Sequence, residues 1–201
     1  MAKRSICAIK VKDTDVIVGM LLRDSPSSAE PKLEEVVPNG LKLWTPLNPP
    51  DPVSTPTQRT VTIAPELLEV VTAKLETSML EQLAARPVSA TLASDGSINL
   101  PLPGAPTPTV AFGSVGQTTE HFDLDLGGNA PSGGSTFYVI VEESDPAPGQ
   151  APQRAVVNDV VLENHQTKVG VHMSPLPKGL TVSIAVIAKG FPVHLEHLML
   201  T

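Results

Sequence analysis

Acidic and amide side chains recur along residues 123–129, where Asp123, Asp125 and Asn129 surround two glycines. Oxygen ligands at alternating positions of a short loop are typical of calcium sites. An EF-hand loop that begins at Asp123 would need a glutamate at its twelfth position, which is Gly134 here. A strand with one wet face would place the same aspartates in solvent. We therefore expect no metal site, and Asp123, Asp125 and Asn129 are the candidates should a cation bind.

The sequence shows no second candidate site among its histidines, its serines and its single cysteine. On a strand, His194 and Glu196 would share one face while His197 points away, which leaves no third metal ligand nearby in sequence. No Gly-x-Ser-x-Gly elbow and no glycine-rich phosphate loop occur. Cys7 is the single cysteine and alternates with apolar residues, which is typical of a buried thiol. We expect neither enzymatic activity nor a cofactor.

Charge and hydropathy limit which classes of partner and which cellular compartment we expect for this chain. The 201 residues carry 14 basic and 21 acidic side chains, and no basic cluster is longer than Lys3-Arg4, so nucleic acid is not an expected partner. No apolar run reaches the roughly 18 residues that cross a bilayer. Lys10, Lys12 and Asp13 interrupt the apolar stretch that a secretory signal would need. We expect a chain made and kept in a cytoplasm, or released from one by lysis.

Apolar runs separated by turn residues predict hairpins in the first hundred residues. Polar residues 12–15 follow one run, while Asn39-Gly40 and Asp95-Gly96 follow two others. Asn-Gly and Asp-Gly adopt the positive φ values that tight turns demand. The expected strand pairs are 5–11 with 16–22, 33–37 with 41–44, and 88–92 with 98–102.

Residues 65–86 are expected to form one long helix. Pro65 suits the first helical position, Glu66 favours the positive end of the helix dipole, and Pro87 ends the segment. Apolar residues recur at intervals of three and four and form one stripe. The stripe packs either against the chain's own core or against another subunit. As an interface it would consist of Leu68, Val71, Leu75, Met79 and Leu83.

Proline-rich stretches predict the division of the chain. Five prolines between residues 46 and 56 exclude a helix or a central strand in the segment 46–58. Four more prolines in residues 101–108 are typical of a semi-stiff linker. We expect a smaller α+β docking region over 1–100, a linker over 101–108, and a β-sandwich module over 109–201.

Short strands at regular spacing fill the C-terminal part and make the chain mainly β. Seven strands in about 90 residues are typical of a sandwich. Apolar residues alternate in 122–126, 137–141 and 182–188, which predicts one buried and one wet face for each strand. The expected strands are 110–115, 121–126, 136–142, 154–157, 168–173, 180–188 and 191–199.

The stretch LPKGLTVSIAVIAKG, from Leu176 to Gly190, resembles the corner and sixth strand of fibronectin type III domains. Val182 stands where that family has a tyrosine, and Phe122 where it has a tryptophan. The resemblance covers the C-terminal half alone, over about residues 108–200. It implies an immunoglobulin-like β-sandwich module, of the kind found in phage virion structural proteins.

Two functions from different classes fit this organisation. The first is a non-catalytic assembly protein, such as a capsid decoration, tail or baseplate component of a virion. It would be assembled in the host cytoplasm through contacts with itself, as a homo-oligomer, or with other structural proteins. The second is a module that binds a surface glycan or a divalent cation through sandwich loops. The expected location is the virion, and the alternative location is the cytoplasm.

Overall fold

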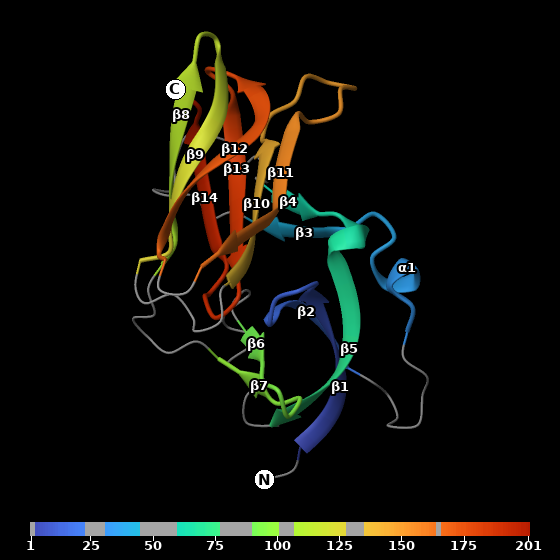
Figure 1. Cartoon of the computed structure of the whole chain (residues 1–201). Helices are drawn as coiled ribbons and strands as arrows, with labels where there is room; N and C mark the ends of the chain where they lie inside the picture. Colours follow the sequence, from blue (N-terminus) through green and yellow to red (C-terminus); the bar gives the residue numbers. More distant parts are fainter. Residues whose placement is uncertain are drawn as a thin grey trace, which may run out of the picture. The chain divides into compact units, whose positions relative to one another are not determined.

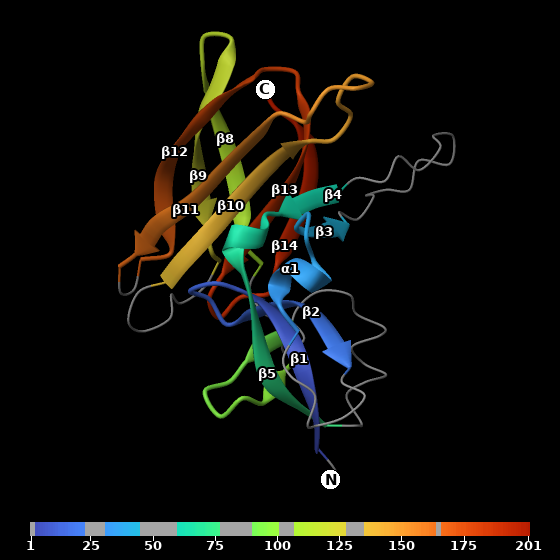
Figure 2. The ribbon, with the colours of Figure 1, turned by 90° about the vertical axis from the view of Figure 1, so that its right-hand side faces the viewer.

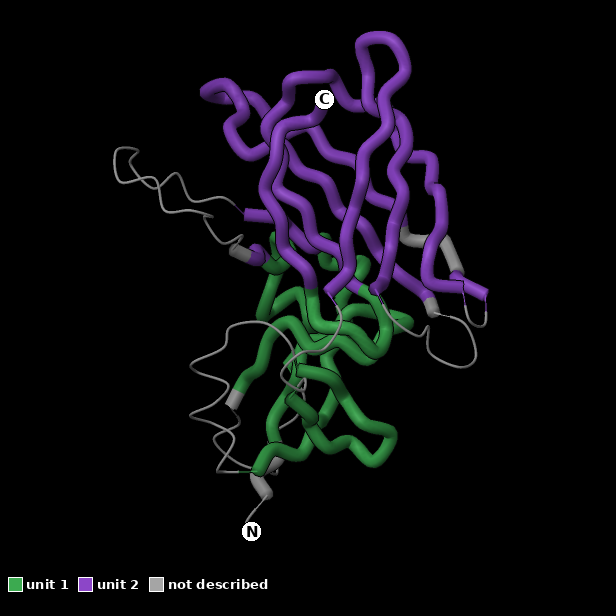
Figure 3. Tube along the Cα trace, turned by 90° about the vertical axis from the view of Figure 1, so that its left-hand side faces the viewer, with its two compact units in different colours: residues 1–41, 64–105, 188–193 green, residues 42–63, 106–187, 194–201 purple. Residues whose placement is uncertain are grey.

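The computed structural model describes residues 3–22, 31–44, 60–76, 90–100, 107–127, 135–163 and 166–201. These residues are mainly β, as expected (Figure 1). They divide into two compact units that interleave along the sequence (Figure 3). The proline-rich segment 46–58, and all of 101–108 except its last two residues, lie outside the described residues. Unit 1 comprises Met1–Leu41, Ala64–Ala105 and Ala188–Val193, and unit 2 comprises Lys42–Ile63, Pro106–Ile187 and His194–Thr201.

Unit 1 is built on a five-stranded sheet in the order β5-β1-β2-β6-β7. The hairpins expected at 5–11/16–22 and 88–92/98–102 are confirmed, the second with shorter strands. In the first turn Asp13 adopts a φ of 58°, and the buried Thr14 hydroxyl donates to Val11 O at 2.8 Å. The strands are β1 (Lys3–Val11), β2 (Val16–Leu22), β5 (Leu68–Glu76), β6 (Ala90–Leu92) and β7 (Ile98–Asn99).

The sheet of unit 1 curls back on itself. The Lys74 N–H of β5 donates to Gly96 O at 2.8 Å, and Lys74 and Ser97 form an isolated parallel bridge. The turn between β6 and β7 therefore returns to the other edge of the sheet, which satisfies backbone groups that an open edge would leave unpaired. The core cluster consists of Ile6, Ala8, Ile17, Ala73, Leu75, Ala90 and Ile98.

The long helix expected over 65–86 is wrong. Pro65 does begin a helical turn, but it is the single 3-10 turn η1 (Pro65–Leu67), and the chain then continues as strand β5. The β-branched residues at 70–72 favour an extended backbone, and β5 pairs with β1 along its whole length, from Leu68 opposite Val11 to Glu76 opposite Lys3. Residues 77–86 lie outside the described part of the chain.

The strand expected over 33–37 is also wrong. These residues form the one-turn helix α1 (Leu33–Val36), in which Val37 N–H donates to Leu33 O at 2.9 Å. The expected turn at Gly40, with a φ of 80°, leads from this helix into β3 (Leu41–Trp44). β3 pairs instead with β4 (Thr60–Ile63). Among the described residues, no helix has the length and apolar character needed to cross a membrane.

Unit 2 contains all seven strands expected in the C-terminal part. β12, β9 and β8 form one antiparallel sheet, and β11, β10, β13 and β14 form a second (Figures 1 and 2). Phe122 and Leu124 of β9 are buried, and the Phe122 ring is tilted by 56° against that of Phe112 of β8, with ring centroids 5.8 Å apart. The strands are β8 (Thr109–Val115), β9 (Thr118–Asp125), β10 (Ser135–Glu143), β11 (Arg154–Leu162), β12 (Lys168–Pro177), β13 (Thr181–Ala188) and β14 (His194–Met199).

The central strands of the four-stranded sheet differ from the expected alternation. β10 is buried without interruption over residues 137–142, and β13 over residues 182–188. Successive side chains of a strand point to opposite faces, so both faces of these strands are covered. The β3–β4 pair belongs to the same unit, and β4 contacts β10 (Figure 2).

A matched pair of variants tests whether residue 75 faces a strand core. Leu75→Glu places a charge among the core side chains of unit 1 and should lower the free energy of unfolding by about 3–5 kcal/mol. Lys74→Glu changes the exposed neighbour on the same strand and should shift it by less than about 0.5 kcal/mol. Urea denaturation followed by circular dichroism measures both, and equal effects would contradict the assignment of β5.

Candidate functional site

An acid–base pair on the four-stranded sheet holds one residue of β4. Glu142 of β10 and Arg154 of β11 are direct cross-strand partners. The Glu142 carboxylate accepts two hydrogen bonds from Thr62, one from its N–H and one from its hydroxyl, each at 3.0 Å. The Arg154 guanidinium donates to Thr62 O. We call these two sheet residues the Thr62 clamp.

The Thr62 clamp occupies the place of a neighbouring strand along the edge of β4. In an antiparallel ladder, the N–H and C=O of one residue bond to the same neighbour. Here the carboxylate supplies the acceptor and the guanidinium supplies the donor, so the main chain of Thr62 is satisfied without a further strand. Val61 and Ile63, on either side of it, are fully buried. The clamp therefore holds Thr62 by its backbone and its hydroxyl, between two buried apolar residues.

Burial makes the clamp energetically important. Glu142 is buried, and the Arg154 side chain is 27% exposed. Arg154 Nε lies 3.7 Å from Glu142 Oε2, which is an ion-pair contact rather than a hydrogen bond. Hydrogen bonds to charged groups contribute about 1.5–3 kcal/mol each. Loss of Arg154 would leave the buried Glu142 carboxylate without its cationic partner, and loss of Glu142 would leave Thr62 and the half-buried Arg154 without theirs.

A second polar cluster links the residue after β10 to β13 and β14. Ser144 Oγ lies 2.9 Å from Ser183 Oγ and 3.2 Å from His197 Nδ1. A serine beside an imidazole is one part of a nucleophilic site. Ser183, however, is fully buried and lies directly opposite His197 on the neighbouring strand. The cluster satisfies buried hydroxyl groups and ties three strands together.

The calcium candidates lie on the outer face of the three-stranded sheet. Asp125 Oδ1 accepts the Gly127 N–H at 2.9 Å, and Asp125 Oδ2 lies 3.1 Å from Lys168 Nζ. The Gly127 N–H first, and Lys168 second, hold the pKa of Asp125 below its usual value. Asn129 lies outside the described residues.

A shallow cavity of about 430 Å³ opens beside these aspartates. Small residues flank Asp123 on both neighbouring strands, because Ala111 and Gly170 are its cross-strand partners. A Cβ at position 170 would lie 3.3 Å from Asp123 Oδ1, so the carboxylate leans over this glycine. Lys168 also lines the cavity and places a cation beside the carboxylates. Within the described ranges, no three His, Cys, Asp or Glu side chains converge to hold a metal ion.

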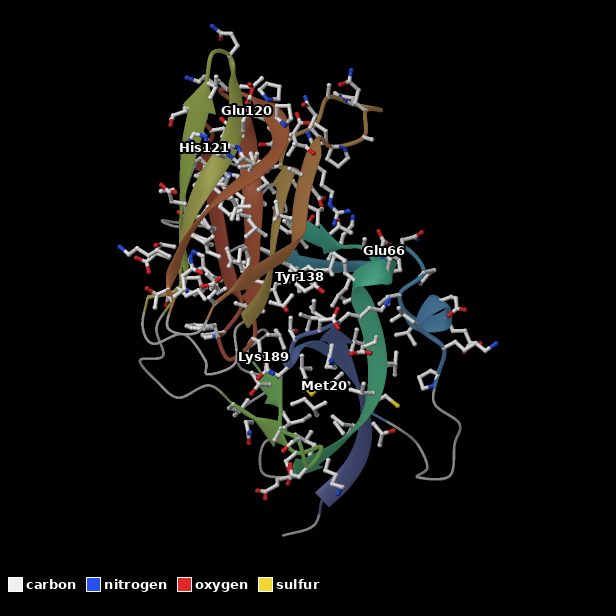
Figure 4. All side chains as sticks on the ribbon, in the orientation of Figure 1. Met20, Glu66, Glu120, His121, Tyr138 and Lys189 are labelled. Atoms are coloured by element: carbon white, nitrogen blue, oxygen red, sulfur yellow. The ribbon has the colours of Figure 1, made fainter. Side chains whose placement is uncertain are left out.

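The histidines of unit 2 make local contacts. His121, labelled in Figure 4, covers Gly113 of β8 so closely that a Cβ there would lie 1.8 Å from its Nε2. Its ring centroid lies 6.0 Å from that of His172. On β14, His194 Nε2 lies 3.3 Å from Glu196 Oε2, which confirms that these residues share a face.

The proposed interface stripe does not exist as a helical face. Leu68 and Leu75 are buried in β5, and Val71 packs against the core cluster of unit 1. Met79 and Leu83 lie outside the described residues. The side chains of Leu68 and Leu75 therefore serve the chain's own core.

Comparison with family models, with curated proteins and with solved structures finds no match to this chain. The sequence reading missed the Thr62 clamp, because its members lie 80 and 92 residues from Thr62. The one available signal was the unbroken apolar runs at 137–141 and 184–188, which indicate strands covered on both faces.

Removal of one clamp residue should destabilise unit 2. We expect Glu142→Ala to lower the free energy of unfolding by about 2–4 kcal/mol, because Arg154 and Thr62 lose their partner. Glu163→Ala removes an exposed carboxylate at the end of the neighbouring strand and serves as the control, with an expected change below about 0.5 kcal/mol. Chemical denaturation gives both values, and an unchanged Glu142→Ala midpoint would contradict the role of the clamp.

The Asp125 carboxyl should titrate below its usual pKa of 3.8. Because the folded pKa is lowered, its contribution to stability is present above the unfolded pKa and is lost as the pH falls through the folded value. Carbon-detected NMR titration should show that Lys168→Ala raises this pKa only partly, since the Gly127 N–H remains. Lys178→Ala is the distant control. A full return to the usual value in Lys168→Ala would show that the backbone contact has no effect.

Proposed function

We propose that this protein is a non-catalytic assembly protein whose second unit is a fibronectin type III-like module for protein–protein contact. The strand order supports the module. The first, second and fifth of its seven strands form one sheet, and the third, sixth and seventh belong to the other. Immunoglobulin-like sandwiches group their strands in this way, and the fourth strand here joins the third. A fold of this kind does not by itself select a function.

The Thr62 clamp is the observation that carries the proposal. It binds an extended polypeptide segment on the outer face of a sheet, through main-chain and side-chain contacts of the kind that protein interfaces use. The other polar groups near it, in the Ser144 cluster, are engaged within the fold. A surface that already holds polypeptide supports a binding role better than a catalytic one.

The virion setting belongs to the same proposal. A net charge of −7 gives no electrostatic footprint for nucleic acid, and a single cysteine excludes an intrachain disulfide. Both features suit a component that is made in a host cytoplasm, assembles there and leaves by lysis. Its partners would be other structural proteins or further copies of itself.

The cavity beside Asp123 favours a second candidate, a module for a divalent cation or a glycan. Asp123 is exposed there, and Thr109 and Lys168 offer further polar groups. Lys168 competes with a cation for Asp125. This candidate therefore requires a ligand that displaces the lysine or accepts its hydrogen bonds.

Mass in solution distinguishes the two candidates. Light scattering over a wide concentration range should show a mass above 21.1 kDa that rises with protein concentration and does not depend on calcium. Asp123→Asn is the control and should assemble like the wild type. A concentration-independent monomer with a melting temperature raised by calcium, and lost in Asp123→Asn, would contradict the assembly role and favour the cation site.

A further inference from the structure

We propose that His121 and His172 together bind one divalent transition-metal ion, such as zinc, on the outer face of the three-stranded sheet. The two residues are direct cross-strand partners on β9 and β12. Their chain neighbours Phe122 and Val171 are buried, so both imidazoles stand on the opposite face, where His172 is exposed and His121 half-buried. This site goes beyond the assembly role proposed above and does not depend on it.

The separation of the two rings suits a shared metal ion. Their centroids lie 6.0 Å apart, and their planes are tilted by 52°. Zinc binds a histidine nitrogen at about 2.0–2.1 Å, which places the ion about 3.2 Å from the centre of the ring. Two rings on one tetrahedral ion therefore have centres about 5 Å apart. A side-chain movement of about 1 Å would bring the observed pair to this separation.

Neither imidazole has a hydrogen bond or an ion pair with another residue in the described part of the chain. The contacts described for His121 and His172 are with each other's rings and, for His121, with Gly113. By contrast, His194 and His197 of β14 contact polar side chains of unit 2. The ring nitrogens of His121 and His172 are therefore free to accept a metal ion.

Gly113 leaves His121 room to reach its partner. This glycine lies opposite His121 on β8, and a Cβ there would lie 1.8 Å from His121 Nε2, so the ring leans over β8 (Figure 4 labels His121). Because residue 113 has no side chain, rotation of the ring towards β12 gives up few packing contacts. The exposed His172 can turn to meet it.

The donor type and the surrounding charges select the metal. Imidazole nitrogens suit zinc, copper and nickel, whereas calcium and magnesium prefer oxygen ligands. Asp123, the next residue of β9 on this face, places an exposed carboxylate near the pair and favours a cation. Lys168, on the same face of β12, is paired with Asp125. Two protein ligands leave coordination positions open, and water would fill them.

Zinc titration of the full chain, prepared without a histidine tag, tests the site. Isothermal titration calorimetry near neutral pH is suitable, because a metal ligand must be an unprotonated imidazole. We expect the wild type to bind one zinc ion per chain. His121→Asn and His172→Asn should each weaken this binding at least about tenfold, because a direct ligand matters at least as much as the outer partners of a metal site.

His194→Asn is the matched control and should bind zinc like the wild type. A wild type that binds no zinc would overturn the proposal. Zinc binding that survives in His121→Asn or His172→Asn, or that falls equally in His194→Asn, would also overturn it. The assembly role is judged separately by the mass of the protein in solution without zinc, so either proposal can fail while the other stands.

A measurement on the unmodified protein covers variants that fail to fold. The imidazole nitrogens of ¹⁵N-labelled wild-type protein are followed by NMR as zinc is added. One ring nitrogen of His121 and one of His172 should shift together and saturate at the same zinc concentration, while calcium should leave both rings unchanged. A shift of only one of the two rings, or of neither, would overturn the shared site.

Discussion

Two strands with apolar side chains on both faces impose the constraint on which unit 2 depends. β10 and β13 lie at the centre of their sheet, and neither has a face suited to water. A single layer of strands cannot bury such residues, because every strand divides its side chains between two sides. β4, drawn from the first third of the sequence, contacts β10 and covers part of it. The Thr62 clamp fixes the register of β4 there, since the clamp residues bond to one residue of that strand.

Unit 1 meets a related constraint in another way. Its sheet is small, and an open edge would leave donors and acceptors unpaired. The bond from Lys74 N–H to Gly96 O brings the two edges together around one apolar cluster. Polar groups again secure the connections: the Thr14 hydroxyl closes the first turn, and Asp15 Oδ1 accepts the Gly190 N–H at 3.0 Å. In both units, buried apolar residues supply the stabilisation, and a few satisfied polar groups decide which segments meet.

Local sequence patterns were enough to predict the strands of unit 2. They failed where contacts between residues far apart in the sequence determine the structure. The seven strands of unit 2 follow from alternation and turn residues, which each segment carries itself. The error at residues 65–86 came from a spacing that suits two structures, because Leu68, Val71 and Leu75 fit a helical stripe while the β-branched residues between them fit a strand. Pairing with β1 decided the outcome. The clamp could not be predicted, because no residue near Thr62 in the sequence indicates that its partner is a carboxylate 80 residues away. Asp123 and Asp125 were placed correctly on a wet strand face, but the ion pair with Lys168 was not foreseen.

The interleaving of the two units also affects how the chain matures on the ribosome. Thr62 emerges long before its clamp, because about 80 further residues must be made before Glu142 is available. Unit 1 in turn includes Ala188–Val193, which are made only after Pro106–Ile187 of unit 2. Domains usually fold one after another during synthesis, beginning at the N-terminus. Here neither unit has all of its parts before residue 188 has been translated. Completion of both folds therefore waits for these residues, and a product truncated before residue 188 would lack a finished unit of either kind.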